Sequence, residues 1–308
     1  MSKITIVGAG NVGASAAHII AEANIVDEIV LLDVAEGLAQ GKALDMMHMR
    51  SVLGFETKIS GTSNYEAARD SDIVVITAGI ARKPGMTRED LCQVNAGIIA
   101  SVIEQAEAVA PQAFYICVTN PLDIMTYLAY QKSGIPSHKL VGMGGVLDSA
   151  RFSFAICEKL GCLPEEVEAW ALGAHGQKMV CWPRLSTVAG KPLTDILEAD
   201  EIAFLEERCI NGGAEVVSCL KTGSAYYAPG ASIARMVKAV MNDTQEVMSV
   251  CAFCDGEYGI RDLYVNVPVR LGKSGVEEIV EFELTAAEQE ALHESAQSIR
   301  ASLEALQA

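Results

Sequence analysis

Short apolar runs alternate with longer amphipathic stretches along the first half of the chain. Near-continuous apolar runs, rich in β-branched residues, occur at 3–7, 28–32, 72–77 and 113–118. Strands of a parallel sheet that is covered on both faces have this composition. Between these runs, apolar positions recur at helical spacing over 13–23, 37–49 and 90–109. The alternation predicts an α/β fold built on a doubly wound parallel sheet.

The pattern changes after about residue 144. The second half predicts helices over 146–160 and, with a glycine-rich break, 201–242, and strands over 167–172, 247–253 and 263–269. Thr285 followed by Glu288 is the signature of a capping box and predicts the start of a last helix. No flexible linker separates the halves, so we expect two packed domains, 1–144 and 145–308, the second of α+β type.

The charge balance disfavours two classes of binding partner. The 308 residues include 23 Lys and Arg against 40 Asp and Glu, a formal net charge of −17. Such a surface is poorly matched to nucleic acid or to anionic membranes, so neither is an expected partner. No apolar run approaches the ~20 residues of a membrane span. The chain starts at once on a strand-like run that leaves no room for a signal peptide, and we expect a cytoplasmic protein.

The nine cysteines are scattered and show no paired metal spacing. Cys251 and Cys254 form a lone CxxC, with no second pair near enough to complete a zinc site. We therefore expect no metal, and we interpret the cysteines as thiols of a cytosolic protein, mostly buried.

A glycine-rich turn joins the first predicted strand to the first predicted helix. Its sequence, G-x-G-x-x-G, is a weak signal alone, but here it follows a strand and opens a helix. The glycines permit a tight turn, a close backbone approach to a pyrophosphate, and close packing of helix on strand. Asp33 follows at the end of the next strand, where a carboxylate binds the adenosine ribose hydroxyls and repels a 2′-phosphate. The predicted dinucleotide site comprises Gly8, Ala9, Gly10, Asn11, Val12, Gly13 and Asp33.

Three further stretches carry candidate chemistry. Arg82, Lys83 and Arg88 lie in a turn-rich segment after an apolar strand, and form either a local anion site or a solvated basic loop. Asp148 and Arg151 stand at i, i+3 spacing and therefore share a helix face. They form either a surface ion pair or part of a site, in which Asp148 orients a base and Arg151 binds a substrate carboxylate. His175 follows a predicted strand and stands between Ala174 and Gly176. These small neighbours would leave its side chain accessible to a ligand. A lone histidine is more often structural.

Taken together, these motifs closely resemble the malate dehydrogenases of the branch similar to lactate dehydrogenases. The resemblance runs nearly end to end. It includes GAGNVG at 8–13, LLDV at 31–34, GxARKPGMTREDL at 79–91, VTNPLD at 118–123, GVLDSARF at 145–152, His-Gly at 175–176 and KTGSAYYAPG at 221–230. It implies an NAD-binding Rossmann domain, an oxidoreductase acting on malate or oxaloacetate, a place in the tricarboxylic acid cycle, and a homodimer or homotetramer.

The resemblance also implies roles for individual residues. His175 would donate and accept the proton, and Asp148 would hold its ring in one tautomer and raise its pKa. Arg151 would bind the carboxylate beside the reacting carbon, and Arg88, on a mobile loop, would polarise the ketone. Arg82, at the specificity position, suits the second carboxylate of a dicarboxylate substrate. Asn120 would contact both substrate and nicotinamide, and the cofactor site would also be lined by Asn95, Val118 and Thr119.

Two departures from the family pattern and three alternatives accompany this interpretation. Gln177 stands where the family has an acidic residue after His-Gly, and the stretch Cys181-Trp182-Pro183 also differs. The nearest alternative is a lactate dehydrogenase or another 2-hydroxy acid dehydrogenase. Another is a non-catalytic NAD-binding protein. NADP as the cofactor is disfavoured by the charge of Asp33.

Overall fold

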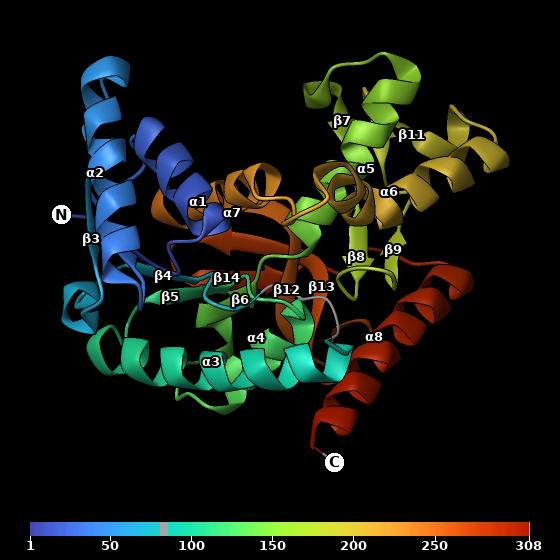
Figure 1. Ribbon diagram of the computed structural model, residues 1–308. Coiled ribbons are helices and arrows are strands. Elements are labelled where there is room, and N and C mark those ends of the chain that lie inside the picture. Colours follow the sequence, from blue (N-terminus) through green and yellow to red (C-terminus); the bar gives the residue numbers. More distant parts are fainter. Residues whose placement is uncertain (81–85, 308) are drawn as a thin grey trace. The chain divides into compact units, whose positions relative to one another are not determined.

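The computed structural model describes residues 1–80 and 86–307, apart from the side chains of Arg88 and Gln307 (Figure 1). The chain forms two compact units, and its second half contributes to both. The first unit contains Met1–Met143, Tyr226–Glu246 and Arg270–Glu278. The second contains Gly144–Ala225, Val247–Val269 and Ile279–Ala308.

A parallel sheet forms the centre of the first unit. Its strands lie in the order β3 (Lys58–Thr62), β2 (Glu28–Leu32), β1 (Lys3–Val7), β4 (Ile73–Ile76), β5 (Phe114–Cys117) and β6 (Leu140–Gly142). Every pair of neighbours is parallel. The four strands predicted from the apolar runs are all present, and β1 and β2 have the predicted bounds. The pattern missed β3 and β6, because β3 is half exposed at the sheet edge and β6 has only three residues.

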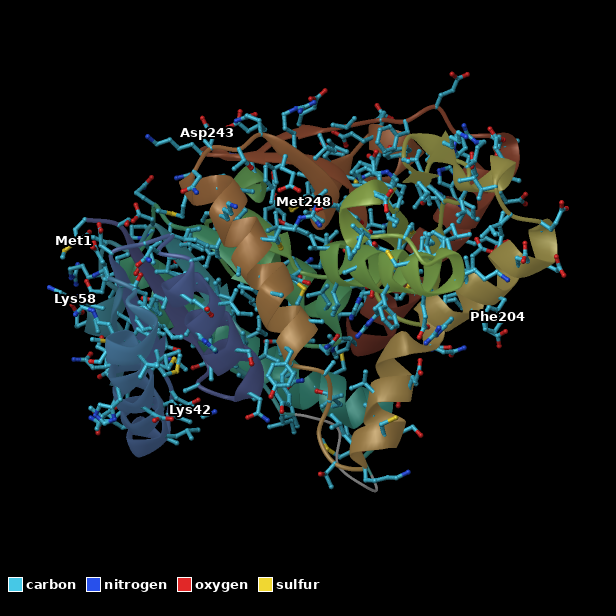
Figure 2. The ribbon with its side chains drawn as sticks, turned by 90° about the horizontal axis from the view of Figure 1, so that it is seen from above. Met1, Lys42, Lys58, Phe204, Asp243 and Met248 are labelled. Carbon is cyan, nitrogen blue, oxygen red and sulfur yellow. The ribbon has the colours of Figure 1, made fainter. Side chains whose placement is uncertain are left out.

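Helices cover both faces of this sheet, as the doubly wound fold requires. In Figure 1, α1 (Asn11–Glu22), α2 (Glu36–Leu53) and α7 (Tyr227–Met241) lie on one face, and α3 (Arg88–Val109) and α4 (Leu122–Gln131) on the other. Figure 2 shows α7 running alongside α1. The two helices approach closely at Gly230, where a Cβ atom would come within 2.7 Å of the Cβ of Ser15. Two 3-10 helices complete the unit, at Tyr65–Ala68 and Ser137–Lys139.

The second unit is built on antiparallel strands. One run has the order β12 (Glu246–Asp255), β13 (Arg261–Gly272), β8 (Ala171–Gly173) and β9 (Met179–Cys181). The strand β14 (Gly275–Ile279), which belongs to the first unit except for Ile279, pairs with β13. A small sheet has the order β11 (Lys191–Pro192), β10 (Thr187–Val188) and β7 (Val167–Glu168). The helices are α5 (Gly145–Leu160), α6 (Ala199–Leu220) and α8 (Ala286–Gln307), with 3-10 turns at Pro164–Glu166, Leu193–Asp195 and Glu257–Gly259. The α/β fold with an α+β second part is therefore confirmed.

The single strand predicted over 167–172 is instead two strands in different sheets. β7 belongs to the small sheet and β8 to the larger one. Between them, the Trp170 N–H donates to Ser186 Oγ, and the Trp170 carbonyl accepts from the Trp182 N–H. The apolar run continues through this change because Trp170 and the β8 residues are all buried. An apolar pattern reports burial and does not reveal a change of partner strand.

The predicted capping box at the start of α8 is present. The Glu288 N–H donates to Thr285 Oγ1, and a Glu288 carboxylate oxygen accepts from the Thr285 N–H at 2.8 Å. Arg184 adds two bonds to the same carboxylate, at 2.8 and 3.1 Å. Burial of Glu288 opposes ionisation, but the bonds from Arg184 and Thr285 prevail and hold its pKa below the usual value. Over the described residues, no helix is both long and apolar enough to cross a bilayer.

Candidate active site

The glycine-rich turn follows β1 directly and leads into α1, as predicted. Gly8 has a φ of +106°, and a Cβ there would lie 2.6 Å from Thr77 Oγ1. A Cβ at Gly13 would lie 2.0 Å from the Gly8 carbonyl oxygen, so helix and strand meet as closely as the backbones allow. Around Gly10 there is open space instead: apart from its neighbours in the chain, no atom of the described residues lies within 4 Å of a built Cβ. The first and third glycines are therefore required by packing, and the second leaves the turn accessible from outside.

Asp33 links the second strand to this turn. One carboxylate oxygen accepts from the Ala9 N–H at 2.7 Å, and the other accepts from the Ala35 N–H at 2.9 Å. Its side chain is partly exposed at the carboxyl end of β2, the edge of a parallel sheet where ligands bind. Burial, together with the negative charge of Asp33, raises the pKa of Tyr65 to about 12. The carboxylate thus places negative charge beside the turn.

The predicted residues Asn95, Thr119 and Asn120 lie together at the same edge. The buried Asn95 amide accepts from the Ile80 N–H at 2.9 Å and donates to the Ile80 and Asn120 carbonyls. Thr119 Oγ1 donates to the Ala78 carbonyl at 2.7 Å. These bonds tie the segments after β4 and β5 to each other, while Asn120 itself is exposed. Val118, also predicted, is partly buried beside them.

The three predicted groups of the second unit are brought together by α5 and the turn after β8. His175 Nδ1 lies 2.7 Å from Asp148 Oδ2, and Arg151 Nη1 lies 3.1 Å from Asp148 Oδ1. Asp148 is 2% exposed, whereas the His175 and Arg151 side chains keep 15% and 20% of their area accessible. A buried carboxylate that receives both a guanidinium and an imidazole nitrogen fixes the orientation of both groups.

Two glycines of α6 were not recognised in the sequence as part of this arrangement. A Cβ at Gly212 would lie 3.2 Å from Arg151 Cδ, and one at Gly213 would lie 3.4 Å from Arg151 Nη2. The helix thus leaves room for the Arg151 side chain along its surface. The Gly-Gly pair inside a helical pattern was a signal for this close approach.

The residues near His175 that depart from the family pattern make contacts with their immediate surroundings. Gln177 Nε2 is 3.4 Å from the Ile210 carbonyl oxygen in an exposed setting. Cys181 is buried beside Cys209, whose hydrogen bond, together with burial, raises the pKa of the Cys181 thiol. Trp182 is fully buried and contacts the rings of Tyr258 and Phe282. The His175–Asp148 contact is present beside these departures.

Two predicted residues lie wholly or partly outside the described part of the chain. Arg82 falls in the segment 81–85, which is not described. Arg88 is the first residue of α3, but its side chain is not among those described. The remaining residues of the prediction fall into two groups, one in each unit.

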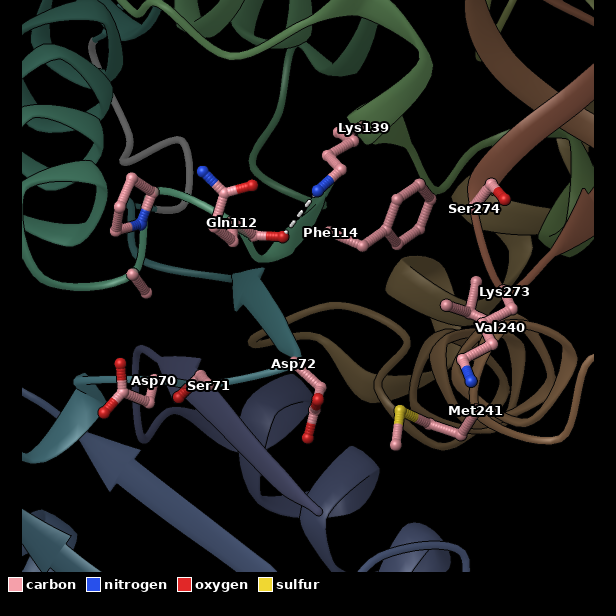
Figure 3. Close-up of a pocket in the computed structure, with 12 residues that line it drawn as sticks. Asp70, Ser71, Asp72, Gln112, Phe114, Lys139, Val240, Met241, Lys273 and Ser274 are labelled. Atoms are coloured by element: carbon pink, nitrogen blue, oxygen red, sulfur yellow. Dashed lines mark hydrogen bonds between the residues drawn. The ribbon is translucent and has the colours of Figure 1, made fainter. Parts of the chain in front are cut away.

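A hollow of about 390 Å³ lies elsewhere, at the amino ends of β4, β5 and β6 (Figure 3). Its lining includes Asp70, Asp72, Lys139 and Lys273, a mixture of both charges. In Figure 3 the Lys139 ammonium points at the Gln112 carbonyl, to which it donates at 2.8 Å. This edge is opposite to the one that carries the glycine-rich turn, so the hollow is no part of the candidate site.

Comparison with known proteins covers the whole chain. Residues 2–142 match the family model of the lactate/malate dehydrogenase NAD-binding domain, and residues 145–308 match that of the α/β C-terminal domain. The malate dehydrogenase of Methanosarcina barkeri is 48% identical, over 100% of both chains. The solved malate dehydrogenase of Salinibacter ruber has 42% identity and a TM-score of 0.95, covering 99% of this chain and 97% of its own.

A lactate dehydrogenase is also similar, although less so in sequence. The Cryptosporidium parvum enzyme, solved with lactic acid and β-nicotinamide adenine dinucleotide, has 38% identity and a TM-score of 0.96, covering 99% of this chain and 98% of its own. The two domain matches and the full-length relatives agree with the resemblance seen in the motifs. The chain belongs to the lactate/malate dehydrogenase family.

Proposed function

We propose that this chain is an NAD-dependent malate dehydrogenase, which interconverts malate and oxaloacetate. The observation that carries the proposal is the buried Asp148 carboxylate bonded at once to His175 and Arg151, in a chain of this family. The lactate alternative is not favoured, since curated relatives at 46–49% identity are malate dehydrogenases. A non-catalytic NAD-binding protein would not need an imidazole held by a buried carboxylate next to an arginine.

The residues of the first unit fit NAD. Open space around Gly10 admits a pyrophosphate to the N-terminal turn of α1, where backbone N–H groups favour an anion. The Asp33 carboxylate accepts hydrogen bonds, which suits ribose hydroxyls, and its charge disfavours the additional phosphate of NADP. Gly8 to Gly13, Asn95, Val118, Thr119 and Asn120 complete the proposed cofactor site. When bound, NAD would supply the hydride acceptor for the carbon that carries the hydroxyl, and NADH would supply the hydride donor in the reverse direction.

His175 moves the proton. Asp148 holds the Nδ1 side of the ring, so Nε2 is the nitrogen that exchanges a proton with the substrate oxygen. In malate oxidation the neutral imidazole accepts the hydroxyl proton, and the buried Asp148 carboxylate stabilises the imidazolium that forms. In oxaloacetate reduction the imidazolium gives the proton back to the carbonyl oxygen. This is the same step in reverse.

Arginines bind and orient the substrate in this proposal. Arg151 presents a guanidinium fork to the carboxylate beside the reacting carbon, with its orientation set by Asp148 and by the room that Gly212 and Gly213 leave. Arg88 polarises the carbonyl, and Arg82 receives the second carboxylate; both assignments rest on the sequence. Two carboxylates held at once fix the face of the substrate that the cofactor meets.

The same proposal extends to the roles of the two parts of the chain, the oligomeric state and the cellular location. Residues 1–144 bind the cofactor and residues 145–308 carry the proton-transfer chemistry. The protein acts as a homodimer or homotetramer, without nucleic-acid or membrane partners, in the cytoplasm and in the tricarboxylic acid cycle.

A substrate comparison tests the proposed activity. NADH oxidation is followed with oxaloacetate, pyruvate and other 2-keto acids, and with NADPH in place of NADH. We expect kcat/KM to be highest for oxaloacetate with NADH, and Arg82→Gln to shift the preference toward pyruvate. A higher kcat/KM for pyruvate in the wild type contradicts the assignment, and a constant absorbance with every substrate supports a non-catalytic protein.

A further inference from the structure

A buried serine on the last helix closes the turn that carries His175. The turn comprises residues 174–178, between β8 and β9. Ser295 Oγ accepts from the Ala174 N–H at 2.8 Å and donates to the Lys178 carbonyl. One side-chain oxygen therefore bonds both ends of the five-residue turn, and the side chain is 3% exposed. Inside the turn, Gly176 has a φ of +105°, which makes the backbone bend sharply there.

The segment just before the turn is held from the other side. Asn266 on β13 donates from Nδ2 to the Gly173 carbonyl at 2.8 Å, and its Oδ1 accepts from the Gly145 N–H at 2.6 Å. Gly145 begins α5, three residues before Asp148, and Gly173 stands two residues before His175. One buried amide therefore joins the backbone that carries the carboxylate to the backbone that carries the imidazole.

Ser295 and Asn266 together leave little freedom to the backbone that carries His175. A Cβ at Gly173 would come 2.3 Å from Ser295 Oγ, so the serine packs directly on the backbone there. Within a low-dielectric interior, hydrogen bonds to buried backbone groups are costly to leave unmade. Within the described part of the chain, both hydrogen bonds of the Ser295 hydroxyl go to backbone groups of the turn, and neither goes to a side chain of the proposed chemistry.

We propose that Ser295 and Asn266 are positioning residues, which hold the His175 ring in register with Asp148 from opposite ends of its backbone segment. The inference rests on the proposed role of His175 in proton transfer. Loss of the Ser295 hydroxyl releases the two ends of the turn, and the imidazole then samples orientations in which Nδ1 is not directed at Asp148. The rate of proton transfer falls, while the sites for cofactor and substrate carboxylate are left intact, since neither lies on this turn.

Ser186 offers a matched control within the same unit. Its hydroxyl also accepts from one backbone N–H, that of Trp170 at 3.0 Å, and donates to one backbone carbonyl, that of Trp182 at 2.9 Å. Ser186 is fully buried and is not bonded to the His175 turn. Ser186→Ala therefore removes the same type and number of bonds as Ser295→Ala, at a different place.

The experiment compares Ser295→Ala, Ser295→Cys and Ser186→Ala with the wild type in oxaloacetate reduction. We expect Ser295→Ala to lower kcat about 10- to 100-fold, because a small misplacement of a catalytic group is enough for such a loss. KM for oxaloacetate and Kd for NADH should stay within about twofold, and Ser186→Ala should keep the wild-type kcat. Ser295→Cys retains a weaker hydrogen-bonding group and should fall between wild type and alanine.

Hydrogen exchange gives a second measurement of the turn. The Ala174 amide should exchange faster in Ser295→Ala than in Ser186→Ala. A kcat of Ser295→Ala equal to that of Ser186→Ala overturns the inference, as does a loss confined to KM. If His175→Asn abolishes turnover while Ser295→Ala is fully active, only this inference fails; if His175→Asn is fully active, the proposed function fails first.

Discussion

His175 Nδ1 and Asp148 Oδ2 are 2.7 Å apart, although 27 residues separate them in the chain. Asp148 is buried on α5, and the imidazole stands on the turn after β8. Because the same carboxylate also receives Arg151, one buried anion sets the direction of both side chains.

Asp148→Asn should impair the orientation of the His175 imidazole without impairing the binding of NADH. The amide keeps the size of the side chain but loses the charge that stabilises imidazolium and selects the tautomer. We expect kcat to fall about 10²- to 10⁴-fold, with Kd for NADH unchanged. Stopped-flow single turnovers and fluorescence titration measure the two quantities. Asp255→Asn, an exposed aspartate of the same unit, is the control and should keep full activity. An Asp148→Asn variant with near-normal kcat would mean that the contact has no catalytic consequence.

The glycines of the turn should respond differently to alanine. Gly13→Ala forces a Cβ to 2.0 Å from the Gly8 carbonyl oxygen, and we expect a loss of about 3 kcal/mol or more in the free energy of unfolding. Gly10→Ala meets open space and should leave stability unchanged while weakening NADH binding about tenfold, since the methyl group occupies the approach of the pyrophosphate. Denaturant titration and NADH titration of both variants test this. Equal NADH affinity in Gly10→Ala and wild type argues against the proposed cofactor position.

Asp33→Asn should relax the cofactor preference. Asparagine can still accept from the Ala9 N–H, so the turn keeps its shape, but the negative charge that repels a 2′-phosphate is gone. We expect the ratio of kcat/KM for NADH to that for NADPH to fall at least tenfold. Asp27→Asn lies just before β2, at the other end of the same strand, and serves as the control. A ratio that does not change shows that Asp33 does not discriminate between the cofactors.

Glu288→Gln should remove a pH-dependent part of stability. Bonds from Arg184 and Thr285 hold the pKa of Glu288 below its usual value despite partial burial. A carboxylate with a depressed folded-state pKa contributes stability that is complete above its unfolded-state pKa and is lost as the pH falls through the folded value. At pH 7 we expect the variant to be less stable by about 1 kcal/mol. The difference should begin to shrink as the pH falls through the ordinary glutamate pKa of ~4.3 and should vanish only below the lower folded-state value. Thermal unfolding of both proteins from pH 7 to pH 3 measures this; a difference that is independent of pH contradicts it.

Local patterns predicted much of the fold and part of the site. The glycine-rich turn, Asp33 and the capping box at Thr285 depend on residues close in sequence, and the structure has each of them at its predicted place. Asp148 and Arg151 share a helix face because they stand three positions apart. The roles of Ser295 and Asn266 could not be predicted, because both residues bond to groups between 93 and 121 positions away in the chain. A single buried polar residue in an apolar pattern does not indicate which group it bonds. The division of the predicted strand into β7 and β8 could not be predicted either, since burial alone does not identify the neighbouring strand.

The most direct test of proton transfer by His175 is the turnover of His175→Asn with oxaloacetate and NADH, measured beside its affinity for NADH. Asparagine retains hydrogen-bonding capacity but has no group that titrates near neutral pH. His293→Asn on α8 is the matched control, because its ring bonds to the Tyr258 carbonyl and not to Asp148. We expect a kcat lower by at least about 10³-fold with Kd for NADH within twofold of wild type. Unchanged turnover in His175→Asn contradicts proton transfer by His175.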